Sequence, residues 1–207
     1  ELLSLLVKAG FSSVFIGIET PDAVSLESCN KIQNGKRDLL QSVRTIQDAG
    51  MEVSAGFIVG FDADTPSIFQ RQIDFIQNSG IVTAMVGLLQ APFGTPLYER
   101  LKKEGRINTE MTGDNTDGST NIIPKMDITV LKDGYKTILK KIYSAEGFYA
   151  RVKTFLSNYN PVSAPVTMEM QEVLALFRTI WKIGIQYMRG SAQQTQRYDS
   201  GTQSVVP

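Results

Sequence analysis

The chain has 207 residues, of which 21 are basic and 21 acidic, so its formal net charge is zero, while 42% are hydrophobic. This length and apolar content suit one large domain or one domain plus a helical extension, and the charge balance excludes a general attraction to nucleic acid. One cysteine, Cys29, and the absence of histidine exclude an internal disulfide, a catalytic device built on histidine, the usual zinc sites and a self-contained iron–sulfur site.

The first hundred residues use one supersecondary pattern three times. Three glycines are typical of helix C-terminal caps: Gly10, Gly50 and Gly80. Each is followed by a short apolar run that predicts a strand: residues 13–18, 52–59 and 82–89. Each run leads to a Thr-Pro pair that predicts a helix start with Thr as N-cap: Thr20-Pro21, Thr65-Pro66 and Thr95-Pro96. Strands that alternate with helices predict an α/β fold with about three parallel βα units.

From about residue 105 the sequence turns polar and then predicts three helices, near 127–142, 145–158 and 167–189. The last carries an apolar stripe with basic residues between, and we expect it to pack on the other helices. A contact with a membrane surface is the alternative. We predict a division at residues 1–105, 106–190 and 191–207, with the last segment disordered.

The loops after the three strands form the predicted functional rim. Ligands meet a parallel sheet at the carboxyl ends of its strands, so "GIETP", "GFDADTP" and "LLQAPFGTP" should be neighbours. Glu19 ends the first strand, and its carboxylate can accept two hydroxyl hydrogen bonds, as from a ribose diol. The alternative is that Glu19 caps the helix that starts at Pro21.

The second strand carries Gly56 within it and Gly60 at its end. Glycine in a strand often marks the close approach of a backbone or ligand, so a flat heterocycle could lie here against Ile58 or Phe61.

Two further features of the rim are polar. Asp62 and Asp64 form a carboxylate pair, which we interpret as turn residues rather than a metal site, since magnesium and calcium need more oxygen ligands at defined spacing. Gln90 follows the third strand and, with the turn at Pro92, could read an adenine edge. The alternative is a rigid turn with one solvated amide.

The motifs "VFIGIET", "AGFIVGFDADT" and "APFGTPLYERL" at these separations resemble the C-terminal half of a radical S-adenosylmethionine domain, in the branch with a cobalamin-binding domain. The stretch "NTDGSTNIIPKMDITVLKDGYKTILKKIYSAEGFYARVKTFL" is similar to the helical extension of a subset of that branch. This subset includes hopanoid-methylase-like enzymes and proteins similar to magnesium-protoporphyrin monomethyl ester cyclase. The resemblance implies a fragment of a partial (βα)6 TIM-like barrel, with strands four to six in residues 1–105 and the helical extension in 106–190.

The resemblance also implies roles for seven residues in binding S-adenosylmethionine. Glu19 would bind the ribose, the strand from Gly56 to Phe61 would contact the adenine through Ile58 and the backbone near Gly60, and the loop from Gln90 to Pro92 would complete the adenine pocket. No catalytic or metal-binding residue is expected.

The family's CxxxCxxC loop for a 4Fe-4S cluster is missing, and Cys29 stands in the wrong unit. We therefore expect an excised C-terminal piece of a cobalamin-dependent methyltransferase or cyclase. It would be inactive alone and bind none of S-adenosylmethionine, the cluster or cobalamin tightly.

The expected partners are the missing N-terminal half of the same enzyme and a small-molecule substrate, not nucleic acid. The alternative is a non-catalytic α/β module that forms oligomers or assembles with a partner through an exposed sheet edge. An independent Rossmann-type domain is disfavoured because the chain has no G-x-G-x-x-G turn. The lone thiol and the lack of a long apolar run predict a cytoplasmic protein.

Overall fold

The computed structural model describes residues 1–28, 38–111, 113, 117–161, 170–171, 173–175, 177–179 and 181. The chain forms two compact units, Glu1–Val162 and Ser163–Pro207, which are described separately. Cys29 and the predicted tail over 191–207 lie outside the described residues. The three-part division at residues 105 and 190 stays a prediction.

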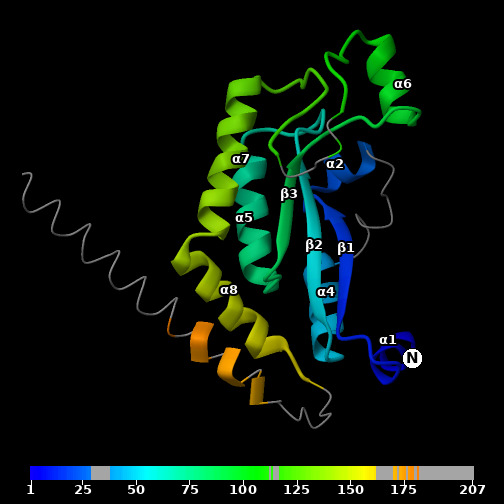
Figure 1. The fold of residues 1–207 in the computed structure, drawn as a ribbon. Coiled ribbons are helices and arrows are strands. Elements are labelled where there is room, and N and C mark those ends of the chain that lie inside the picture. Colours follow the sequence, from blue (N-terminus) through cyan, green and yellow to red (C-terminus); the bar gives the residue numbers. More distant parts are fainter. Residues whose placement is uncertain are drawn as a thin grey trace, which may run out of the picture. The chain divides into compact units, whose positions relative to one another are not determined.

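The first unit is built on a three-stranded parallel sheet, in which β2 lies between β1 and β3 (Figure 1). The strands match the three apolar runs of the sequence: β1 Ser13–Glu19, β2 Glu52–Val59 and β3 Ala84–Leu88. The prediction of an α/β fold with parallel strands is confirmed. Because all three strands run in the same direction, their carboxyl ends lie at one edge of the sheet.

The helices of this unit alternate with the strands and then follow them: α1 Leu2–Lys8, α2 Ala23–Ser28, α4 Leu39–Asp48, α5 Ser67–Ser79, α6 Pro96–Lys103, α7 Ile128–Ile142 and α8 Ala145–Asn158. The three predicted cap glycines all have positive φ, as left-handed C-terminal caps require: Gly10, Gly50 and Gly80.

Of the three predicted Thr caps, one is confirmed. Thr95 accepts a hydrogen bond from the Tyr98 amide at the start of α6. The prediction for Thr65 is wrong: α5 begins one residue later, without a side-chain cap. The prediction for Thr20 is also wrong, since Asp22 accepts from the Ser25 amide instead. Asp is as good a cap as Thr, and nothing in the dipeptide pattern distinguishes the two.

The main core lies between one face of the sheet and helices α4, α5 and α7. In β2 exposure alternates strictly, so every second side chain is buried against these helices. The buried residues that form this layer on the three helices and on β2 are Val43, Ile68, Phe69, Ile73, Ile76, Leu131, Tyr135, Ile138, Ile142, Val53, Ala55, Phe57 and Val59.

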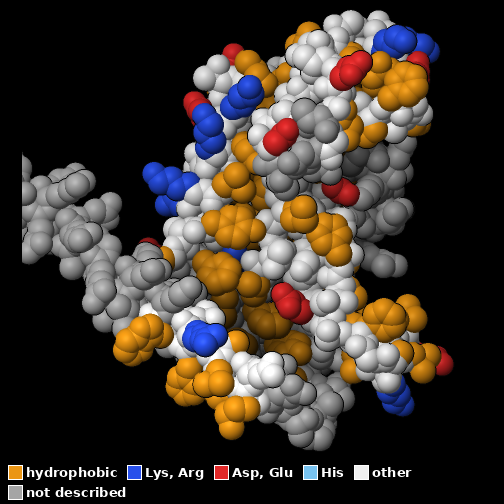
Figure 2. Space-filling model, in the orientation of Figure 1, with side chains coloured by type: hydrophobic (Ala, Val, Ile, Leu, Met, Phe, Trp, Pro, Cys, Tyr) orange, Lys and Arg blue, Asp and Glu red, His pale blue; other side chains and the backbone are white. Residues whose placement is uncertain are grey.

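The opposite face of the sheet is not covered by helices of the described part of this unit. Phe15 on β1 is 61% exposed and Met85 on β3 is 44% exposed, although both are large apolar side chains. Figure 2 shows hydrophobic side chains exposed in front of the strands on this face. An apolar sheet face of this kind is typical of a binding site or an interface.

Helix α8 is fixed to the rest of the first unit through Arg151, whose side chain is fully buried. Its guanidinium donates to the Ile142 carbonyl at the end of α7 (2.6 Å), to the Val82 carbonyl before β3 (3.1 Å) and to Oε1 of Gln77 on α5 (2.8 Å). Burial lowers the pKa of Arg151. No carboxylate pairs with this cation among the ion pairs of the described residues.

In the second unit, the structure describes only short helical stretches between residues 170 and 181, and the rest of the predicted helix over 167–189 lies outside the described residues. No described helix of the chain is long and apolar enough to cross a membrane.

Candidate functional site

A cavity of about 350 Å³ lies on the uncovered face of the sheet, toward the carboxyl ends of the strands. The strand register explains its position, since Gly17 pairs with Gly56, Gly56 with Met85, and Ile58 with Gly87. Its lining includes five of the seven predicted site residues, drawn from β1, β2 and the loop after β3: Glu19, Gly56, Ile58, Gln90 and Pro92. These residues, far apart in the sequence, thus line one cavity.

Glu19 has an unusual backbone conformation. It is the one non-glycine residue with positive φ (66°) in the part of the chain that the structure describes. The Thr20 amide donates to the Ile18 carbonyl at 2.9 Å, so Glu19 is the central residue of a γ-turn of the rare left-handed kind. The ladder between β1 and β2 shifts register here, between Gly17 and Glu19. Strained residues of this kind cluster at functional sites, because the surrounding structure has to enforce them.

The middle of the cavity wall is made by small and apolar residues. A Cβ at Gly56 would lie 3.4 Å from the ring of Phe15, so that ring passes directly over the glycine. Ile58 and Met85 add flexible apolar surface on either side, and Gly87 leaves the β3 backbone uncovered. Such a wall can accept a flat ring by stacking, with few polar groups to fix its orientation.

The loop after β3 is held by the segment that follows α6. Asn121 binds the backbone of Ala91 twice, because Nδ2 donates to the carbonyl and Oδ1 accepts from the amide, each at 2.8 Å. Thr120 donates to the Leu89 carbonyl at 2.6 Å, and Gln90 donates to the Ser119 carbonyl at 3.4 Å. The side chain of Gln90 therefore reaches the cavity from a fixed loop. Sequence reasoning missed Asn121, since it lies in a polar stretch that reads only as a loop.

Gly60 and Phe61 are not part of the cavity lining. Phe61 is buried in a second apolar cluster, with Leu89 and Leu101 among its members. Both amides, of Gly60 and of Phe61, donate to Oδ2 of Asp64, at 2.8 and 3.1 Å. The structure thus gives these two residues a packing and turn role, where the resemblance implied contact with adenine.

The two carboxylates of the "DAD" turn have separate roles. Burial raises the pKa of Asp64, although Ser25 and the two amides donate to it. Asp62 pairs with Arg106 at 2.6 Å and with Arg100 at 2.7 Å. Burial by itself would raise the pKa of Asp62, but the hydrogen bonds from the arginines outweigh it and lower the pKa to about 2. The interpretation as turn residues is supported by these contacts.

The residues present fit a nucleoside better than a metal or a cluster. The described residues contain no group of three or more His, Cys, Asp or Glu that could hold a metal ion. One cysteine in the whole sequence cannot hold a 4Fe-4S cluster, which takes three or four thiolates. The cavity, by contrast, combines a carboxylate, an amide and an apolar wall, which suit hydroxyls, a base edge and a ring.

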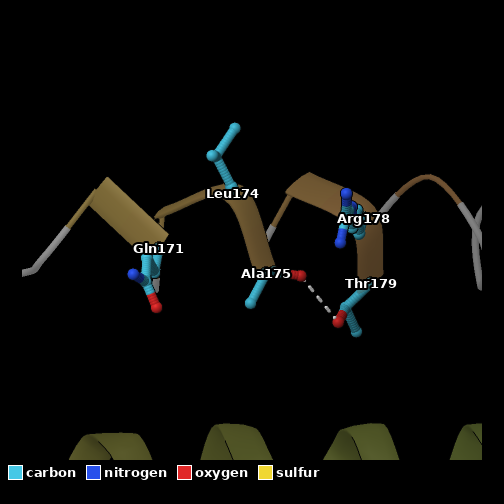
Figure 3. A pocket seen from close by; sticks show the side chains of 5 residues that line it. All are labelled: Gln171, Leu174, Ala175, Arg178 and Thr179. Carbon is cyan, nitrogen blue, oxygen red and sulfur yellow. Dashed lines mark hydrogen bonds between the residues drawn. The ribbon is translucent and has the colours of Figure 1, made fainter.

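A second hollow, of about 590 Å³, lies in the second unit (Figure 3). Its described lining comes from the short helical stretches between residues 170 and 181: Gln171, Leu174, Ala175, Arg178 and Thr179. Leu174 points to the opposite side from Gln171 and Thr179, and the Thr179 hydroxyl donates to the Ala175 carbonyl one turn back. These side chains do not converge on a common point, so this hollow is not the candidate site.

Comparison with known proteins gave matches of two kinds. A family described as a domain of unknown function, DUF4070, matches residues 95–191. An uncharacterized methyltransferase (sll1242) of Synechocystis sp. is 34% identical over 189 residues, which cover 89% of this chain and 35% of that protein. A hopanoid C-2 methylase of Rhodopseudomonas palustris is 33% identical over 193 residues, covering 89% of this chain and 36% of that protein. The chain thus spans about a third of the length of these relatives.

Proposed function

We propose that this chain, as a relative of the hopanoid-methylase-like radical S-adenosylmethionine proteins, supplies one side of a cofactor pocket in such a methylase. This is the side that binds the ribose and the adenine. The resemblance stated from the sequence is confirmed by those matches. The pocket role depends on one observation above all, which is the convergence of Glu19, Ile58 and Gln90 on one cavity.

Each side of the cavity then has a task. The Glu19 carboxylate accepts hydrogen bonds from the two ribose hydroxyls, because ionised carboxylates accept several hydrogen bonds at once. The adenine lies on Ile58 and over the backbone of Gly87, beside the Phe15 ring that covers Gly56. Gln90 binds the edge of the base, and Pro92 closes the rim. S-adenosylmethionine, when bound in the whole enzyme, supplies the methyl group that a methylase transfers.

The sheet fits the same proposal. β1 and β3 are edge strands, and β1 has a single neighbour among the described strands. We place β1 to β3 as the fourth to sixth strands of a partial (βα)6 barrel, with the uncovered face as its inner face. The open edge of β1 then pairs with a strand from the rest of the enzyme, which also brings the cluster and, in the cobalamin-binding branch, cobalamin. Without that part the pocket is half complete, so nucleoside binding by this chain alone is weak.

An NMR titration of the isotope-labelled chain with S-adenosylmethionine at millimolar concentrations tests this proposal. The amides of Gly56 and Gly87 and the methyl groups of Ile58 should shift with a common dissociation constant, and the Glu19→Gln variant should weaken binding about tenfold, the order expected for a charge-assisted hydrogen bond. The matched control variant is Glu52→Gln, which changes a carboxylate at the start of β2, the end of that strand away from the cavity. Shifts confined to other surfaces, or equal losses in both variants, would count against the pocket.

A further inference from the structure

Gln72, on helix α5, touches the candidate site from behind the sheet. Its side chain is fully buried, and Nε2 donates to two backbone carbonyls: that of Ile58 at 2.8 Å and that of Glu19 at 3.3 Å. The first belongs to β2 and the second to the last residue of β1. One amide group therefore ties together the carboxyl ends of the two strands.

The position of this tie is informative. The β1–β2 ladder loses its regular register at Gly17 and Glu19, and the γ-turn at Glu19 follows at once. Where the regular pairing ends, the strand carbonyls need another donor, since buried polar groups are costly without one. Nε2 of Gln72 is that donor for both strands.

The orientation of the amide is fixed by its surroundings. Two carbonyl oxygens face the same end of the side chain, so that end has to be the NH2 group. Oε1 of Gln72 is buried and has no hydrogen-bond partner in the described structure. Keeping a buried acceptor unsatisfied lowers stability, and an apolar residue here would continue the buried stripe of Ile68 and Ile76. The contribution of this amide is therefore its two donated hydrogen bonds, to the Ile58 and Glu19 carbonyls.

We infer that Gln72 is a positioning residue for the pocket: its bond to the Glu19 carbonyl holds the strained γ-turn and so directs the Glu19 carboxylate at the cavity. The first half of this inference concerns the turn alone, and the second half rests on the proposed function. Gln72 touches no ligand in this account, and it acts through Glu19.

A matched control exists in the same unit. Gln47, on α4, is also fully buried, donates from Nε2 to the Ser79 carbonyl at 3.1 Å, and leaves Oε1 without a partner in the described structure. It lies next to the C-terminal end of α5 and not at the γ-turn. Gln47→Met and Gln72→Met thus each remove a buried side-chain amide that donates to backbone carbonyls. Only Gln72→Met removes the donor to the Glu19 carbonyl.

The first arm of the test is amide hydrogen exchange, which needs no ligand. The Thr20 amide makes the γ-turn bond to the Ile18 carbonyl, so its exchange reports whether the turn is closed. In Gln72→Met we expect Thr20 to exchange at least tenfold faster relative to the amides of β3, whereas in Gln47→Met all these amides should accelerate together. If Gln72→Met does not fold, Gln72→Asn, which shortens the donor by one methylene, is measured in the same way. An unchanged ratio of Thr20 to β3 exchange in the folded variant would overturn the inference.

The second arm measures binding of 5′-deoxyadenosine, by NMR, to the wild type and to single and double variants. Gln72→Met should weaken binding about as much as Glu19→Gln does, and the double variant should be no weaker than Glu19→Gln alone, because both changes remove one interaction. If the double variant lost affinity by the product of the two single-variant factors, the two side chains would act independently, and action of Gln72 through Glu19 would be refuted. If the wild type binds no nucleoside, the proposed function fails, while the Thr20 arm still decides whether Gln72 holds the turn.

Discussion

Replacing Arg151 with methionine tests how α8 is held in the first unit. The change keeps an unbranched apolar stem, shorter than that of arginine, and removes the buried guanidinium with its three hydrogen bonds to Ile142, Val82 and Gln77. Bonds to a charged group contribute about 1.5–3 kcal/mol each, so on the order of 5–9 kcal/mol is lost. Methionine also avoids the several kcal/mol that it costs to bury an unpaired cation. We expect a net destabilisation of about 2–4 kcal/mol.

Urea unfolding, followed by circular dichroism at 222 nm, measures this effect. The midpoint should fall with an unchanged denaturant slope, since the surface exposed on unfolding stays the same. Arg151→Lys should be destabilised too, because a compact ammonium cannot reach three acceptors arranged for a guanidinium. Lys140→Met, on the exposed side of α7, is the control and should shift stability by less than about 0.5 kcal/mol. A variant Arg151→Met as stable as the wild type would refute the reasoning, because the cost of burying the charge would then equal the gain from its bonds.

Three further predictions concern the first unit. Asp62 has a folded-state pKa of about 2 against its usual 3.8, so its ion pairs stabilise the fold above about pH 4, and this contribution is lost as the pH falls toward 2; Asp62→Asn should flatten the pH dependence of urea stability in that window. Gly134→Ala should lower the melting temperature, since its Cβ would overlap the ring of Phe69 and overpacking costs about 1–3 kcal/mol; a melting temperature equal to the wild type would contradict this contact. Glu19→Gly should raise the free energy of unfolding by about 1 kcal/mol, because glycine adopts φ near 66° without strain, whereas Glu52→Gly in regular β2 should lower it.

The elements of the fold could be predicted because their signals are local. The three cap glycines and the three apolar runs are such signals, because backbone sterics at a helix end and the burial of a short strand both act over a few residues. The convergence on one cavity followed from the rule that parallel strands end at the same edge. It placed Glu19, Ile58 and Gln90 together without any knowledge of side-chain contacts.

The features that could not be predicted depend on competition between nearby groups. The Gly60 and Phe61 amides could have faced a ligand, but the Asp64 carboxylate four residues along takes both. The γ-turn at Glu19 leaves no trace in the sequence, because glutamate rarely adopts positive φ. Gln72 did leave a signal, a polar residue between Ile68 and Ile76 on the buried side of α5, but its acceptors come from strands 14 and 53 residues away.

The most direct measurement is a crystal structure of the chain soaked with 5′-deoxyadenosine. The account predicts the adenine on Ile58 and both ribose hydroxyls within hydrogen-bond distance of the Glu19 carboxylate. Nucleoside density on the helical side of the sheet, or in the cavity with the ribose turned away from Glu19, would contradict it.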